Sequence, residues 1–191
     1  MTHAPAVWYL MRASGVVTLL LLTLALGLGI ATSNRWRPEG SRLYVTTTLH
    51  RDASLLAVVF LAVHVLTAVV DPDAGVGLAS VVLPVGGSVW LAGGTLALDA
   101  LTAVTITSLL RRRLSYGLWR TIHWSAYAAW PLAVTHGLGM GSDDGTWWLD
   151  VVAIACLGTV AGAVTWRVLS ALVSATPARA AASTTARPRG R

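Results

Sequence analysis

Long uncharged apolar segments are the feature of this chain that most restricts its fold. Residues 13–33, for example, are 21 consecutive positions without a charged side chain. A helix needs about 20 apolar residues to cross the roughly 30 Å hydrocarbon core of a bilayer. Charged residues make up 12% of the chain and hydrophobic residues 55%, whereas soluble proteins carry roughly 25% charge. The pattern predicts an integral membrane protein with an all-α fold.

Five such segments predict a polytopic bundle of about five transmembrane helices. We expect the spans at about residues 7–31, 49–70, 89–110, 119–138 and 147–173. The first is longer than the roughly 7–15-residue core of a signal peptide, so we expect it to be retained. Residues 75–88 contain Pro84, Gly86 and Gly87, which favours a surface or re-entrant segment, with a sixth, partial helix as the alternative. Residues 1–175 are expected to form one transmembrane domain, and residues 176–191 a disordered, Arg-rich cytoplasmic tail.

The arginines predict the orientation of these spans. Two interhelical joints and the tail hold most of them, at Arg35, Arg37, Arg42, Arg51, Arg111, Arg112, Arg113, Arg120, Arg179, Arg187, Arg189 and Arg191. The other two joints are acidic, with Asp71, Asp73, Asp143 and Asp144. The positive-inside rule then places the N-terminus outside and the C-terminus in the cytoplasm of a multi-pass plasma membrane protein. This topology accounts for the net charge of +6, and the pattern of a nucleic-acid site is absent.

Four of the five histidines lie in the second and fourth predicted spans. His50 and His64 are 14 residues apart, which is about 21 Å along a helix axis. His123 and His136 are 13 residues apart, or about 19.5 Å. Because one span lies between them, the two helices cross in the same direction. We therefore expect His50 to face His123 near the cytoplasmic side (the inner pair) and His64 to face His136 near the outer side (the outer pair).

Two imidazoles at each level suit the axial positions of a b-type haem iron. A haem with two axial ligands lacks an open position, which favours electron transfer over oxygen binding. Zinc or copper would need ligands gathered around one ion, usually with cysteine or carboxylate help. The spacing therefore favours two haems, one per level; histidines that only pack in a membrane scaffold are the remaining alternative.

The 13-residue spacing sets one difficulty for this arrangement. On an ideal helix, 13 steps leave His136 about 140° away from His123. Either a kink or break in the fourth span brings the two histidines onto one face, or the two haems contact the span on different faces. Pro131 lies between the two histidines and is one candidate for the turn, with a tolerated membrane proline as the alternative.

Arginines near the histidines are candidates for contacts with haem propionates. Arg51 and Arg120 lie close to the inner histidines in sequence, and Arg111–Arg113 could serve there too. Arg12 is the candidate at the outer level. The alternative is that these arginines only fix the topology. Asp99 lies inside the third span, where it could bond a hydroxyl or a histidine N–H or relay protons, and the sequence does not choose among these.

The histidine spacing and the basic inner rim resemble the ferric reductase-like transmembrane domain family. This family includes ferric reductases, NADPH oxidases and the haem-binding subunit of the periplasmic methionine sulfoxide reductase system. The segments that carry the resemblance are residues 12–15, 49–51 with His64, 107–112, 119–124, and 130–132 with His136 and Gly137. The resemblance covers roughly residues 7–173 and implies haem b ligation by His50, His64, His123 and His136, with electron flow across the membrane.

The chain departs from the family's fused oxidases after its last span. No Gly-rich nucleotide fingerprint follows residue 173, so FAD or FMN and NAD(P)H are expected only on a separate partner. We expect an oxidoreductase membrane subunit without catalytic residues of its own. Its donor would be a cytoplasmic flavin reductase and its outer acceptor ferric ion, oxygen or a redox protein. A quinol-oxidising membrane cytochrome b is the alternative function.

Overall fold

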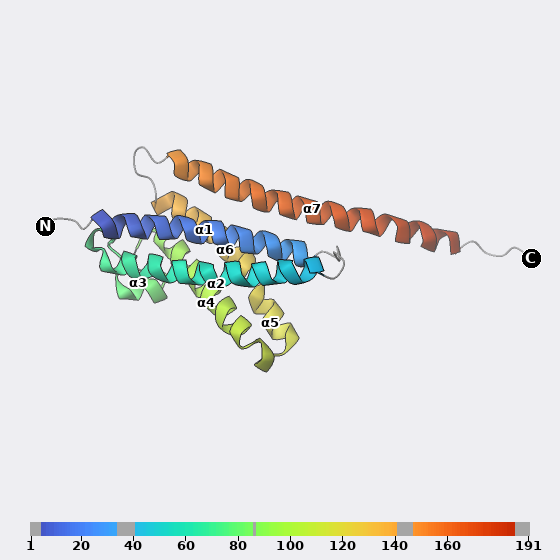
Figure 1. Ribbon diagram of the computed structural model, residues 1–191, viewed down its shortest axis with the longest axis horizontal. Coiled ribbons are helices and arrows are strands. Elements are labelled where there is room, and N and C mark those ends of the chain that lie inside the picture. Colours follow the sequence, from blue (N-terminus) through green and yellow to red (C-terminus); the bar gives the residue numbers. More distant parts are fainter. Residues whose placement is uncertain (1–4, 34–40, 86, 141–146, 186–191) are drawn as a thin grey trace, which may run out of the picture.

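The computed structural model describes residues 5–33, 41–85, 87–140 and 147–185, and every regular element in these ranges is a helix. Figure 1 shows their arrangement. The elements are α1 (Pro5–Ser33), α2 (Ser41–Val70), the 3₁₀ turn η1 (Pro72–Ala74), α3 (Leu78–Val82), α4 (Val89–Leu109), the 3₁₀ turn η2 (Arg111–Arg113), α5 (Tyr116–His123), α6 (Ala126–Met140) and α7 (Trp147–Thr185). The predicted all-α fold is confirmed.

Four helices of the described ranges are long and apolar enough to cross a bilayer: Ala6–Thr32, Tyr44–Val70, Val89–Leu109 and Trp147–Val173. They correspond to the first, second, third and fifth predicted spans. Large apolar side chains on them face outward, and Leu66 and Leu172, for example, are 64% and 61% exposed. An apolar exterior on long helices is what contact with lipid requires, so the chain is a membrane protein.

The fourth predicted span differs from one continuous helix. It consists of α5 and α6, which are separated at Trp124 and Ser125. The Ser125 hydroxyl donates to the carbonyl of Ile122 at 2.7 Å, and such a bond competes with regular helix geometry. Pro131 lies within α6 without ending it. The helix is therefore interrupted between His123 and His136 at Trp124–Ser125, and a turn at Pro131 remains a prediction.

The helices pack in two main pairs. α1 lies antiparallel beside α2, α4 packs on α6, and α7 runs along α1 and extends beyond the bundle (Figure 1). A small core of Trp130, Val134 and Cys156 joins α6 to α7 and α1. The Trp130 indole N–H donates to the Thr23 hydroxyl at 2.9 Å, which satisfies a polar group that would be costly to bury alone.

The segment between α2 and α4 contains a short helix. This agrees with the alternative prediction of a partial helix within residues 75–88. Asp71 caps η1 by accepting from the Asp73 amide, and Gly75 follows with a φ of 62°. The five-residue α3 comes next. The Thr95 hydroxyl donates to the Ser80 carbonyl at 2.6 Å and so ties α3 to α4.

Some predictions fall partly or wholly outside the described residues. Helix α7 continues to Thr185, past the boundary expected at residue 175, although its side chains are described only to residue 173. Outside the description lie Gly86, Arg35, Arg37, Asp143, Asp144 and the side chain of Arg42, together with residues 186–191. The two-part division of the chain and the orientation of its termini remain predictions.

Candidate functional site

Four histidines of α2, α5 and α6 form two matched pairs. His50 on α2 and His123 on α5 have ring centroids 6.2 Å apart, with their planes at 67°. His64 on α2 and His136 on α6 also have centroids 6.2 Å apart, with their planes at 82°. The structure thus brings together the same inner and outer pairs that the spacing predicts.

The ring separation fits two imidazoles on opposite sides of one metal ion. A metal–imidazole bond is roughly 2.0–2.1 Å and the nitrogen lies about 1.1 Å from the ring centre, so two trans imidazoles have centres about 6.3 Å apart. Both pairs lie at 6.2 Å. Within the described ranges, no cluster of three or more His, Cys, Asp or Glu side chains could hold an ion. Each pair offers two imidazoles, which is the number of protein ligands that a bis-histidine haem takes.

Three of the four histidines bond a backbone carbonyl through Nδ1. Because a carbonyl can only accept, the Nδ1–H donates and Nε2 remains as the free lone pair, as a metal ligand requires. The bonds are His50 to Ala25 at 2.8 Å, His64 to Met11 at 2.8 Å and His136 to Trp90 at 2.9 Å. They orient each ring and set its tautomer.

A glycine follows each of these carbonyls by four residues. A Cβ on Gly15 would lie 2.9 Å from His64 Nδ1, and one on Gly94 would lie 2.5 Å from His136 Nδ1. On Gly29 it would lie 3.4 Å from His50 Cε1. We call this arrangement, in which a histidine ring lies against a glycine and bonds the carbonyl four residues earlier, a glycine–carbonyl contact. The missing Cβ lets the imidazole reach the helix backbone.

His123 lacks such a contact. Its Nδ1 is buried and has no hydrogen-bond partner among the described residues. Instead its ring stacks on Trp119, with centroids 4.9 Å apart and planes at 25°. An aromatic pair contributes about 0.5–1.5 kcal/mol beyond area burial, much like the net value of about 0.5–1.5 kcal/mol for a hydrogen bond. A stack of this kind and a hydrogen bond therefore contribute free energies of similar size.

The spacing of the chain explains the difference. His136 meets Gly94, and His123 lies 13 residues earlier on the antiparallel partner, so it should face about residue 107 of α4. Thr107 and Ser108 stand there, and neither is a glycine. The Trp119 indole N–H donates to the Ser108 hydroxyl at 3.4 Å, which places that part of α4 beside the stack.

A cavity of about 400 Å³ opens beside the outer pair. This volume lies within the roughly 300–1,000 Å³ range of sites for small molecules and cofactors. Its lining includes Met11, Arg12, Gly15, His64, Gly94 and His136. Most of the other lining side chains are apolar, so the cavity suits a largely apolar group with a polar edge.

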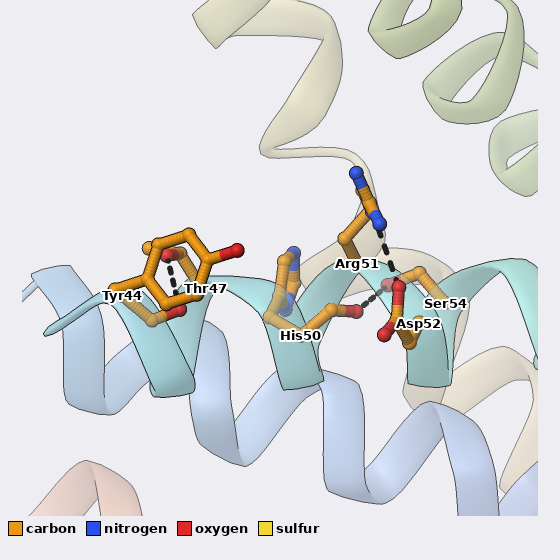
Figure 2. Close-up of polar contacts among 6 residues, drawn as sticks. All are labelled: Tyr44, Thr47, His50, Arg51, Asp52 and Ser54. Atoms are coloured by element: carbon orange, nitrogen blue, oxygen red, sulfur yellow. Dashed lines mark hydrogen bonds and ion pairs between the residues drawn. The ribbon is translucent and has the colours of Figure 1, made fainter. Parts of the chain in front are cut away.

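The arginine candidates differ in their surroundings. Arg12 lines the outer cavity and lies over the Trp8 ring at 4.7 Å. Arg51 pairs with Asp52 at 3.2 Å (Figure 2), and both side chains are largely exposed. Arg120 lies over the Trp124 ring at 5.1 Å. Of the three, Arg12 is the one that lines the cavity, and a propionate role for any of them remains a prediction.

Asp99 is an exposed residue of α4. Asp99 does not hold the N–H of His50, His64 or His136, since those three Nδ1–H groups donate to backbone carbonyls. Sequence reasoning missed these glycine–carbonyl contacts. A signal for two of them is present, because Gly15 and Gly29 are 14 residues apart, as His50 and His64 are.

One protein-family model matches most of the chain. Residues 14–134 match the model of the ferric reductase like transmembrane component. The match includes His50, His64 and His123 and ends two residues before His136. Comparisons with curated proteins and with solved structures gave no significant match. Because the matched region is more than half of the chain and contains three of the four paired histidines, the protein belongs to the family of ferric reductase like transmembrane components.

Proposed function

We propose that this protein carries electrons across the membrane through two b-type haems, one held by His50 and His123 and the other by His64 and His136. Membership of the family supports membrane electron transfer in general, and the family generally binds haem. The observation that carries the proposal is the pair of matched imidazole couples, each with centroids 6.2 Å apart.

The chain's own residues supply ligation, orientation and exclusion of water. Carbonyl bonds hold three imidazoles with Nε2 free, and glycines let the rings lie against α1 and α4. The walls of the outer cavity are mostly apolar, so they offer few polar groups that could bind water. Haem held by two imidazoles at each level would supply reversible one-electron chemistry. Arg12 is the proposed propionate partner at the outer level, and Arg51 or Arg120 at the inner level.

The arginine distribution supports a direction for this transfer. With the N-terminus outside and the C-terminus in the cytoplasm of the plasma membrane, the inner pair lies on the electron-donor side. The proposed donor is a separate flavin reductase that carries FAD or FMN and oxidises NAD(P)H. The proposed acceptor is ferric ion, oxygen or a redox protein on the outer side.

Haem stoichiometry of the purified chain tests the proposal. We expect two haems per chain with a b-type reduced-minus-oxidised spectrum, and about one haem per chain in His64→Ala. Thr67→Ala is the matched control, because Thr67 lies one turn away on α2 and its hydroxyl donates to the Val63 and His64 carbonyls of the same helix. Two intact haems in His64→Ala, or none in the wild type, would overturn the assignment.

The same purified chain can be used to test whether the electron donor is a flavin reductase or quinol. Reduction of the isolated chain by a flavin reductase with NAD(P)H, and not by quinol, is the result expected. Rapid reduction by quinol alone would instead make the protein a quinol-oxidising cytochrome b.

A further inference from the structure

Three aromatic rings and one guanidinium form a continuous group on α5 and its preceding turn. Trp119 stacks on His123 four residues later, which places both on one face of the helix. Tyr116 lies on the same face, and its ring centroid is 6.0 Å from that of Trp119. The Arg111 guanidinium lies 4.6 Å from the Trp119 centroid and 5.4 Å from that of Tyr116.

Trp119 is held from several directions. Its N–H points to the Ser108 hydroxyl at the end of α4, and Arg111 contacts its ring from η2. The Ser115 side chain caps the start of α5 by accepting from the Leu118 amide. The indole is therefore fixed relative to α4 and η2 as well as to its own helix, and it can pass that constraint to His123.

We propose that Trp119 is a positioning residue for His123, whose imidazole plane it fixes by stacking where the other three histidines are fixed by a backbone carbonyl. The inference rests on the proposed function, because it assigns a role in haem ligation at the inner level. A metal-bound histidine ordinarily has a hydrogen-bonded partner that orients its ring, and loss of that partner costs roughly 10–100-fold in metal affinity. Removal of the stack should have an effect at the lower end of this range.

Variants with a single haem isolate the inner level. In a His64→Ala background only the inner haem remains, and in a His50→Ala background only the outer one. Adding Trp119→Leu to the first should speed haem loss to excess apomyoglobin by roughly tenfold. It should also shift or broaden the low-spin ferric EPR signal, which depends on the angle between the axial imidazole planes. Adding it to the second should change neither measurement.

Two further substitutions separate stacking from general damage to α5. Trp119→Phe keeps an aromatic ring and should restore most of the wild-type signal and haem retention. Leu118→Ala shortens a half-exposed apolar side chain of α5 that takes no part in the group of rings, and it should behave as wild type. Unchanged haem loss and EPR signal in Trp119→Leu, with two haems in the wild type, would overturn this inference alone. A wild-type chain without haem would overturn the proposed function and this inference with it.

Discussion

The outer and inner histidine pairs have the same ring separation but different support. In the outer pair, both imidazoles donate to carbonyls, and both lie closer than 3.0 Å to where a glycine Cβ would stand. In the inner pair, only His50 has a carbonyl partner, its glycine is less crowded at 3.4 Å, and His123 relies on Trp119. The comparison shows that one spacing between imidazoles can be held by backbone bonds or by ring stacking.

The difference follows from which helices carry the histidines. α2 lies along α1, and the 14-residue spacing of Gly15 and Gly29 on α1 matches that of His50 and His64. α6 lies along α4, and its His136 ring lies against Gly94 of that helix. α5 is a separate short helix whose facing residues on α4 carry side chains. The inner level is therefore the one whose geometry depends on side chains.

The largest effect is expected from a methyl group added at the outer level. In Gly94→Ala the new Cβ would lie 2.5 Å from His136 Nδ1, so the ring or the helix must move. We expect the outer haem to fall from about one to near zero per chain, measured by haem stoichiometry. Gly15→Ala, at 2.9 Å from His64, should cause a smaller loss at the same level.

Two glycines of α1 serve as controls for this series. A Cβ on Gly29 would be 3.4 Å from His50, so Gly29→Ala should retain most of the inner haem. A Cβ on Gly27 would meet nothing within 4 Å, and Gly27→Ala should retain both haems. Equal haem loss in all four variants would show that the glycines serve helix packing and not the histidines.

A moderate effect is expected from the outer arginine. Arg12→Gln keeps a polar side chain but removes the cation at the rim of the outer cavity. Loss of a charged hydrogen bond of about 1.5 kcal/mol should speed loss of the outer haem by roughly tenfold. Arg51→Gln is the comparison variant, because Arg51 is largely exposed and does not line the outer cavity. Similar haem loss in both would remove the distinction between them.

The smallest effect is expected from Ser108→Ala at the inner level. The Trp119–Ser108 bond is 3.4 Å long, beyond the usual range of about 2.7–3.2 Å for an N–H···O bond. Its loss should change inner haem retention by less than about threefold in the apomyoglobin assay, since the ring stack remains. An effect as large as that of Trp119→Leu would assign the positioning to the hydrogen bond and not to the stack.

Much of the arrangement follows from sequence because apolar length and helical rise are simple quantities. Residues 49–70 are apolar enough to span a bilayer, and 14 residues separate their histidines by about 21 Å. The helix direction then decides which imidazoles face each other. No side-chain detail is needed for that step, which is why the inner and outer pairs could be expected before the structure was known.

The position of the helix break and the hydrogen-bond partners of the histidines could not be predicted from residue spacing, because several side chains and carbonyls compete for each role. The break at Trp124–Ser125 arises where a serine hydroxyl bonds the carbonyl of Ile122, whereas proline is the residue that sequence reasoning associates with a kink. Similarly, Asp99 is the conspicuous polar residue of its span, yet the histidines bond backbone carbonyls. Every residue has a backbone carbonyl. The glycine four residues later is therefore the sequence signal for which carbonyl a histidine ring can reach.

The short length of α5 has a consequence for how readily its histidine is released. His50, His64 and His136 are tied by hydrogen bonds to the backbone of a neighbouring helix. His123 is the last residue of an eight-residue helix, and a helix of that length depends mostly on its packing contacts for stability. Local unfolding of α5 would release one imidazole and leave the other three in place. His123 is thus the imidazole of the four that is expected to be released most readily.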